Sequence, residues 1–311
     1  MKGYQFLFSV SAVVLIIVLL DLACHPMMDM LRKKALLAHP DNYEMTSYYG
    51  VEMASEDMLI LGASTATHHY DPSLLHDSLH FSVRNLGKDG ASLYCQICQL
   101  RLILDRHVPR WVIWDVSDDC LSHNKDWSDF MEISDYWPYR QNDYSNAIIQ
   151  EMGPYQPVYM HSWLYRYNTK LPEYLFSFIS GRQSQKGYVP LPVVSEPSFE
   201  KEVNEIPDNI NEKKVDLFES LLSLCIQKGT KVILVTSPRF SIDNIEETVQ
   251  YRTLCEKAET LDIPYYNYHK DPRFFNDISL FRDVDHLNQK GAELFTVCLI
   301  QDLSQDSRIK L

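Results

Sequence analysis

Residues 58–72 read MLILGASTATHHYDP, and this stretch contains the pattern that decides the fold. Its first four residues form an apolar run of the length of a buried strand, and the run ends at Gly62. Ser64 follows two residues later, where a helix could begin. A strand, a glycine and a helix start in this order are typical of an α/β sheet. Because ligands of such sheets bind beyond the carboxyl ends of the strands, Ser64 is a first candidate for function.

The rest of the chain continues this alternation of strand and helix. Apolar runs predict four further strands, at 81–86, 111–116, 231–236 and 264–268. Helical periodicity and end signals predict helices at 72–79, 91–107, 211–228, 242–261 and 288–303. Strands that alternate with helices form parallel sheets covered on both faces. The sequence therefore predicts an α/β fold, a three-layer flavodoxin-like sandwich with a parallel sheet of about five strands.

The first 24 residues predict a membrane anchor. The segment from Tyr4 to Leu20 carries no charge, and with one interruption at Asp21 the apolar stretch reaches about 20 residues, near the length that crosses a bilayer. Lys2 is the only basic residue ahead of it, and no small-residue cleavage site follows, so a cleaved signal peptide fits less well. A lipoprotein signal ending at Cys24 and a buried core helix are the alternatives.

A long insertion separates the third and fourth predicted strands. We expect the chain to divide into an anchor at 1–24, a juxtamembrane linker or helix at 25–56, and an α/β domain at 57–311 with the insertion at 121–208. The insertion holds nine tyrosines between 136 and 188 and three tryptophans, Trp127, Trp137 and Trp163. Helical pieces are predicted at 145–151 and 158–167. These aromatic residues could form the core of a helical subdomain or a lid whose faces stack on sugar rings, and the two are compatible.

Composition excludes some classes of function. The 311 residues carry 29 Lys and Arg against 42 Asp and Glu, a net charge of −13 that disfavours a nucleic-acid partner. The pair Cys95 and Cys98 forms a C-x-x-C, but it lies inside a predicted helix without the second half of a zinc site. The seven cysteines are therefore interpreted as mostly buried thiols. No metal and no organic cofactor is implied.

A second segment whose residues could take part in catalysis lies near the other end of the chain. Residues 281–295 read FRDVDHLNQKGAELF, with Asp283 and His286 three residues apart just before the last predicted helix. A carboxylate at this spacing can bind one nitrogen of the imidazole ring while the other nitrogen faces a nucleophile. A serine hydroxyl needs such a base to become a good nucleophile. Asp285 is an alternative partner for His286, and Ser64 alone could be a helix N-cap.

Taken together and in order, these segments resemble the SGNH/GDSL hydrolase family. The matching features are G-x-S at 62–64, NLGKDG at 85–90 and D-x-x-H-L-N at 283–288, and the resemblance spans about residues 57–303. Two stretches, LGASTATHHYDP and HLNQKGAELF, look most like membrane-anchored bacterial members of the family. The resemblance implies Ser64 as nucleophile, His286 as general base and then general acid, and Asp283 as the residue that orients His286.

The resemblance also implies an oxyanion hole built from the backbone N–H groups of Ser64 and Gly90. The third block of the family normally adds an Asn side chain, whereas the matching segment WDVSDDC has Asp119 in about that place. An ionised Asp would repel an oxyanion, and losing one such donor costs about 100- to 1,000-fold in rate. The side chain of Asn85 is one candidate substitute.

Four further histidines are candidates for binding roles. His68 and His69 follow Ser64 closely, so they could line the substrate site or could be polar residues at a helix start. His76 and His80 have the i, i+4 spacing of metal ligands, but the sequence places no third ligand beside them.

The sequence thus predicts a serine esterase or O-acyltransferase for acylated cell-envelope glycans or small esters. The expected location is the inner membrane, single-pass, with the catalytic domain on the extracytoplasmic side. Lys2 favours a cytoplasmic N-terminus, but Arg32, Lys33 and Lys34 oppose it, so the orientation follows from the resemblance. The alternative is a weakly active or inactive protein of the same fold that binds glycans or assists assembly.

Overall fold

The sheet has the topology that the sequence predicts. The computed structural model describes residues 2–117, 119–122, 133–151, 153–167, 183–201 and 209–309. Its five strands are β1 (Met58–Leu61), β2 (Val83–Asn85), β3 (Trp111–Asp115), β4 (Lys231–Thr236) and β5 (Tyr265–Asn267). They are all parallel, in the order β2-β1-β3-β4-β5. This is the flavodoxin-like order, so the α/β prediction is confirmed.

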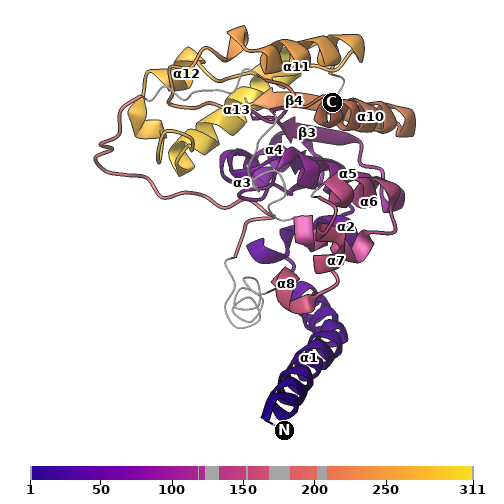
Figure 1. Ribbon diagram of the computed structural model, residues 1–311. Coiled ribbons are helices and arrows are strands. Elements are labelled where there is room, and N and C mark those ends of the chain that lie inside the picture. The colour runs from indigo at the N-terminus through magenta and orange to yellow at the C-terminus, as the bar shows by residue number, and fades with distance from the viewer. Residues whose placement is uncertain are drawn as a thin grey trace.

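One face of the sheet packs against a layer of helices on the side of α5 (Figure 1). Alternate strand residues point into this layer, among them Leu59, Val112 and Leu234, because side chains alternate across a strand. The covering helices are α2 (Thr46–Glu52), α5 (Leu93–Arg106), α10 (Glu212–Lys228) and α11 (Val249–Thr260). Cys95 and Cys98 are buried free thiols on α5, which agrees with the interpretation as helix-face residues.

The other face packs against the helices that surround the candidate site. The strand residues in between, such as Ile60, Ile113 and Val235, point into this second layer. Its helices are α3 (Ser64–His69), α4 (Pro72–Leu79), α12 (Pro272–Phe275) and α13 (Gln289–Gln305). The two layers on either side of one sheet complete the three-layer sandwich.

Local signals set the helix ends. The side chain of Ser92 caps α5, that of Asn211 caps α10 and that of Asn288 caps α13, each by accepting backbone N–H groups of the first turn. The predicted helix over 242–261 is interrupted: a short 3-10 turn at Ile245–Glu247 precedes α11, because Thr248 is extended and caps the true helix.

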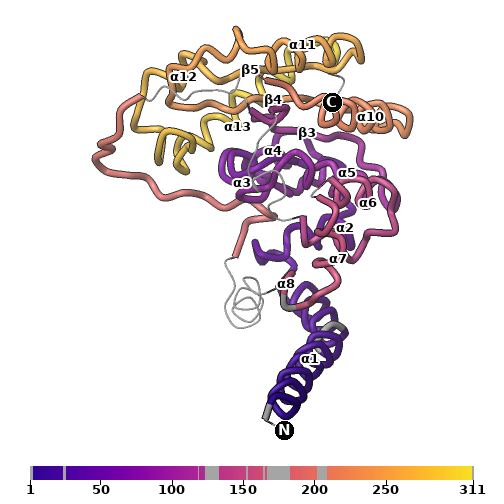
Figure 2. The backbone as a smooth tube through the Cα atoms, in the orientation of Figure 1, coloured from indigo at the N-terminus to yellow at the C-terminus, as the bar shows by residue number. Residues whose placement is uncertain are grey.

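The N-terminal helix α1 runs from Lys2 to Ala38 without a break at the expected boundary of 24 (Figures 1 and 2). Helix Gly3–Ala38 is long and apolar enough to cross a membrane, with a mean hydropathy of 2.7 in its most apolar window, none of which is buried. A signal sequence would pass the same test. Beyond this window, Met28, Ala35 and Leu36 pack against the domain in a cluster with Trp163.

The described part of the insertion is helical between 133 and 167, whereas residues 183–201 form isolated bridges, turns and coil. The helical part comprises a 3-10 segment at Ile133–Tyr139, α6 (Asp143–Glu151), α7 (Gln156–Tyr159) and α8 (Trp163–Tyr167). The helix expected over 158–167 is therefore split in two. Trp137 is buried in the cluster that covers one face of the sheet, and Trp163 is buried in a cluster with residues of α1. Trp127 lies outside the described residues.

Candidate active site

Ser64 is the first residue of α3, directly beyond the carboxyl end of β1. The turn that leads to it depends on Gly62, whose φ of 152° lies outside the range that other residues adopt easily. A Cβ atom at position 62 would lie 2.6 Å from the Cβ of Ala66 and 2.9 Å from the carbonyl oxygen of Asp115. Glycine therefore lets the backbone pass close to β3 and brings Ser64 to the edge of the sheet.

Ser64, His286 and Asp283 form one chain of hydrogen bonds, although 222 residues separate the serine from the histidine. The Oγ atom of Ser64 lies 2.8 Å from Nε2 of His286, and Nδ1 of His286 lies 2.8 Å from Oδ1 of Asp283. Since the carboxylate only accepts, Nδ1 carries the proton and Nε2 is free to accept from the hydroxyl. The structure therefore brings together the three residues that the resemblance implies.

The backbone around His286 is held by several hydrogen bonds. Oδ1 of Asp283 accepts the N–H groups of Asp285 and His286 at 3.0 and 2.9 Å, and the carbonyl of His286 accepts from Arg282 at 2.7 Å. Burial opposes ionisation of Asp283, but the hydrogen bonds from His286 and Asp285 and the charge of His286 lower the pKa of Asp283 below its ordinary value. Asp283 is therefore a carboxylate at neutral pH.

Asp285, the alternative partner for His286, faces a different group. Its Oδ1 accepts from Nε of Arg239 at 3.0 Å and also from Nη2 of the same side chain. The neighbouring Phe240 donates its N–H to the carbonyl of Val284 at 2.8 Å. The segment that follows β4 thus also holds the loop of His286 in place.

Gly90 and Asn85 are the expected oxyanion donors, and the structure shows that the amide of Asn85 has other partners. Gly90 has a φ of 73°, a left-handed conformation that suits glycine, and it lies in the loop between β2 and α5. The amide nitrogen of Asn85 instead donates to the carbonyls of Ala66 and Tyr70 at 2.6 and 3.2 Å. Both of its N–H groups are used, so the expectation that Asn85 replaces the third donor is not met. The side chain of Asn85 therefore links β2 to α3 through these hydrogen bonds.

Asp119 does not supply a donor either. Its carboxylate accepts a hydrogen bond from the hydroxyl of Ser117 at 2.8 Å. Asp119 is therefore an acceptor in this structure.

His68 is almost fully buried beside the candidate triad. Its ring lies edge-to-face with that of His286, with centroids 5.6 Å apart. Nδ1 of His68 lies 2.6 Å from the carbonyl of Val189, and Nε2 lies 3.2 Å from Oδ1 of Asp89. The end of the insertion, at Val189, therefore reaches the site, and Asp89 directly precedes Gly90.

His69 lies behind His286 rather than at the surface. It is completely buried, so the expectation that His69 lines the substrate site is not met. Nε2 of His69 accepts the N–H of Leu287, the residue after His286, at 2.9 Å. Burial, together with the charges of His286, His68 and Arg239, lowers the pKa of His69 well below its ordinary value. Its neutral ring can therefore serve as an acceptor, a role that only the folded chain reveals.

His76 lies in the last turn of α4, and His80 directly follows this helix. Nδ1 of His76 faces the carbonyl of Phe81 at 2.6 Å, and His80 ends α4 in a left-handed conformation. Within the described ranges, no group of three or more His, Cys, Asp or Glu side chains is arranged to hold a metal ion.

A buried polar network, which the sequence did not predict, links the ends of β3 and β4 to the region of α3. Oδ2 of Asp115, at the end of β3, accepts from the hydroxyl of Ser237 at 2.6 Å, and that hydroxyl lies 3.2 Å from the hydroxyl of Tyr70. Burial raises the pKa of Asp115 to about 6, although hydrogen bonds from Ser237, Thr65 and Tyr70 oppose the shift. Thr65 follows the candidate nucleophile directly.

Asp115 predicts a measurable dependence of stability on pH. Because its pKa is higher in the folded than in the unfolded chain, its contribution to stability is greatest at low pH and is lost as the pH rises through about 6. The free energy of unfolding of the wild type relative to Asp115→Asn should fall by up to about 3 kcal/mol between about pH 4 and pH 7. Chemical unfolding of both proteins at the two pH values measures this difference. A difference independent of pH would contradict it.

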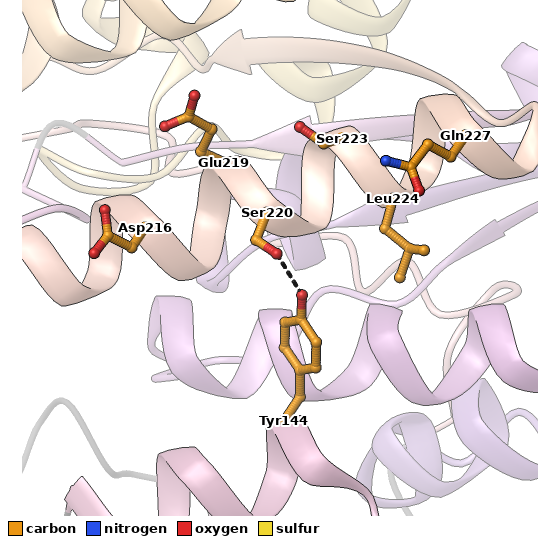
Figure 3. A pocket seen from close by; sticks show the side chains of 7 residues that line it. All are labelled: Tyr144, Asp216, Glu219, Ser220, Ser223, Leu224 and Gln227. Atoms are coloured by element: carbon orange, nitrogen blue, oxygen red, sulfur yellow. Dashed lines mark hydrogen bonds between the residues drawn. The ribbon is translucent and has the colours of Figure 1, made fainter.

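A surface cavity between α6 and α10 is separate from these groups (Figure 3). The hydroxyls of Tyr144 and Ser220 meet across it at 2.6 Å. Its other lining residues are Asp216, Glu219, Ser223, Leu224 and Gln227, and none belongs to the candidate site.

Comparisons with known proteins give likenesses of fold at low identity. No protein-family model and no curated protein matches the chain. Among solved structures, it is similar to a candidate acylhydrolase from Bacteroides fragilis (14% identity, TM-score 0.41, 84% of this chain and 95% of the other). It is also similar to an acetylxylan esterase from Geobacillus stearothermophilus (12%, TM-score 0.41, 83% and 99%). A third is an alpha/beta hydrolase enzyme from the metagenome of Lake Arreo in Spain (10%, TM-score 0.41, 81% and 96%).

Proposed function

We propose that the protein is a serine esterase or O-acyltransferase whose nucleophile is Ser64. The observation that carries this proposal is the pair of 2.8 Å contacts that join Ser64 to His286 and His286 to Asp283. A hydroxyl, an imidazole and a carboxylate in this order are the parts that acyl transfer through a serine requires.

In the first half-reaction, Oγ of Ser64 attacks the ester carbonyl while Nε2 of His286 takes its proton. The carboxylate of Asp283 keeps Nδ1 protonated and stabilises the imidazolium that forms. His286 then gives the proton to the leaving alcohol as the carbonyl–oxygen bond breaks. The acyl group remains on Ser64 as an ester.

The charge on the tetrahedral intermediate needs donors at the edge of the sheet. The N–H of Ser64 is available in principle, because the first N–H groups of a helix have no partner within the helix. We assign the second donor to the N–H of Gly90, whose left-handed conformation sets the direction of the loop after β2. With Asp119 at the third block, the site has one donor fewer than its relatives, and we expect slow turnover of simple esters.

In the second half-reaction, an acceptor oxygen attacks the acyl carbon while Nε2 of His286 removes the proton of the acceptor. The bond between the acyl carbon and Oγ of Ser64 then breaks, and His286 returns the proton to Oγ, which restores the free serine. Water as the acceptor gives hydrolysis, and a sugar hydroxyl gives transfer. The two activities share the acyl-enzyme, so they differ only in the acceptor. Product analysis with an added acceptor sugar distinguishes them.

The substrate class and location are also part of this proposal. The chain's resemblance to membrane-anchored members of the SGNH family favours acylated glycans of the cell envelope. The apolar window of α1, none of it buried, supports a membrane anchor. The inner membrane as the location, with the catalytic domain outside the cytoplasm, rests on the resemblance.

The second candidate is a binding or assembly protein of the same fold that no longer reacts. Asp119 and the engaged amide of Asn85 favour it, because neither offers a third donor to an oxyanion. The aligned hydrogen bonds of Ser64, His286 and Asp283 favour the enzyme.

The experiment that separates the two is an assay of the purified full-length chain with 4-nitrophenyl acetate, wild type against Ser64→Ala. It is paired with labelling by a fluorophosphonate. A wild type that neither hydrolyses the ester nor takes the label would favour the binding protein.

His69 predicts a smaller effect that tests the positioning of His286. In His69→Phe, the buried N–H of Leu287 loses its acceptor, and we expect kcat to fall about 10- to 100-fold because the base is displaced. His69→Gln offers an amide oxygen near the place of Nε2 and should recover most of the rate. KM should change little in either variant. A Gln variant as slow as the Phe variant, or a loss confined to KM, would contradict this role.

A further inference from the structure

The ring of His68 lies between two hydrogen-bond acceptors. His68 comes four residues after Ser64 on α3, about one helical turn, and its side chain is almost fully buried. Nδ1 lies 2.6 Å from the carbonyl oxygen of Val189, and Nε2 lies 3.2 Å from Oδ1 of Asp89. Carbonyl and carboxylate oxygens only accept, so each ring nitrogen is best satisfied when it carries a proton. The two partners therefore favour the imidazolium form of His68, paired with the carboxylate of Asp89.

Asp89 lies in the loop between β2 and α5, directly before Gly90, the proposed second oxyanion donor. Its side chain is 39% exposed, but Oδ1, the oxygen that faces His68, is shielded from water. A carboxylate oxygen without water needs a cation or a donor beside it, because the loss of its hydration is costly. An imidazolium at His68 meets this need, and the pair therefore ties the loop to α3.

The peptide group between Asp89 and Gly90 carries the N–H that the proposed reaction uses. This group is planar, so its direction follows from the position of the residue on either side. Gly90 restricts it little, because a glycine backbone rotates more freely than any other. Asp89 restricts it more, because its own N–H donates to the hydroxyl of Tyr43 at 2.6 Å and its side chain faces His68. Tyr43 thus holds the backbone of Asp89, and His68 holds its side chain.

The same loop also contacts the turn that carries the nucleophile. The N–H of Lys88 lies 3.3 Å from the carbonyl oxygen of Gly62, two residues before Ser64. Asp119 accepts a hydrogen bond, so the proposed oxyanion hole relies on the N–H groups of Ser64 and Gly90. An error in the direction of either donor is therefore expected to slow the reaction.

We infer that the pair of His68 and Asp89 positions the N–H of Gly90 toward the oxyanion. Both residues act through Gly90 and are positioning residues. The inference rests on the proposed function, because it uses the role that Gly90 has there. It adds to that proposal a buried ion pair, outside the triad, that the reaction requires.

The test compares 4-nitrophenyl acetate with its thiono analogue, in which sulfur replaces the carbonyl oxygen. Sulfur is larger and accepts hydrogen bonds more weakly, so an aligned oxyanion hole favours the oxygen ester. In the purified full-length chain, we expect Asp89→Ala to lower kcat for the oxygen ester about 10- to 100-fold, with little change in KM. The preference for the oxygen ester over the thiono ester should fall in parallel, because the lost interaction is the one that the sulfur already weakens.

A double-mutant cycle tests whether the two residues act as a pair. His68→Phe keeps a ring of similar size and the edge-to-face contact with His286, but it removes both nitrogens. We expect it to slow the reaction at least as much as Asp89→Ala does. Adding Asp89→Ala to His68→Phe should then cost less than about threefold in kcat, because the pair is already broken. Losses that multiply would show two independent roles and would contradict the pairing.

Asp57→Ala is the matched control for the loss of a structural carboxylate. Asp57 directly precedes β1, at the amino end of the sheet, and accepts from the N–H and the hydroxyl of Ser82 at 3.1 and 2.7 Å. Its removal should lower the melting temperature without changing kcat or the preference between the two esters.

The outcomes separate this inference from the proposed function. A wild type whose activity depends on Ser64, together with an unchanged kcat in Asp89→Ala, would overturn the inference alone. A change confined to KM would assign the pair to substrate binding, and equal slowing of both esters would remove its link to the oxyanion, so either result overturns it. A wild type no faster than Ser64→Ala would remove the proposed function and the inference together. Asp89 is partly exposed, so Asp89→Ala decides the question even if His68→Phe does not fold.

Discussion

Replacing Ser64 with alanine is expected to lower kcat/KM for 4-nitrophenyl acetate by at least about 1,000-fold, because no acyl-enzyme can form. The remaining rate would come from binding and from the oxyanion donors, which the substitution leaves in place. Fluorophosphonate should label the wild type on Ser64, and the variant should not be labelled.

The matched control for this result is Ser73→Ala. Ser73 is an exposed serine on α4, so its removal should change neither rate nor labelling. The melting temperature of Ser64→Ala should stay close to that of the wild type, because Ser64 loses one hydrogen bond at a partly exposed position. Equal rates in the wild type and in Ser64→Ala would remove the serine from the mechanism.

The sheet was predictable because buried parallel strands are apolar on both faces. Met58–Leu61 and Trp111–Asp115 therefore stand out as continuous runs, and right-handed crossovers then place helices on both faces of the sheet. β2 and β5 are each two or three residues shorter than expected, because they lie at the edges of the sheet, where pairing on one side ends sooner.

Two parts of the site were accessible from the sequence for the same reason. Ser64 follows a strand and His286 precedes a helix, so topology alone sends both to the carboxyl edge of the sheet. The sequence could not predict the hydrogen bonds between residues that lie far apart along the chain. Nothing near His69 predicts that its ring accepts from Leu287, and nothing near Asp115 predicts its contact with Ser237.

Residues 25–38, expected as part of a linker or helix, continue the helix of the proposed anchor. Asp21 and Pro26 interrupt the apolar pattern, yet α1 continues to Ala38. The continuation is stabilised by contacts with Trp163, which is more than a hundred residues away in sequence. Tertiary packing commonly overrides such local signals.

Asp283→Asn is expected to lower kcat about 100- to 10,000-fold while it preserves the turn. Oδ1 of Asp283 accepts three N–H groups: Nδ1 of His286 and the backbone groups of Asp285 and His286. An amide oxygen can accept all three, so the geometry should survive. The negative charge does not survive, and the imidazolium formed in the transition state loses its stabilisation. Asp283→Ala should be at least as slow and should also lower the melting temperature, because the turn loses its acceptor.

The control lies two residues away. Asp285 has the same side chain in the same loop but binds Arg239 instead of His286. Asp285→Asn should therefore cost less than about tenfold in kcat, since it weakens a support of the loop without touching the charge beside the ring. If Asp285→Asn were the slower of the two variants, the orienting carboxylate would be Asp285, and the loop would have to rearrange when substrate binds. If both were mild, the base would work without a carboxylate, and the hydrogen bond between Asp283 and His286 would be structural alone.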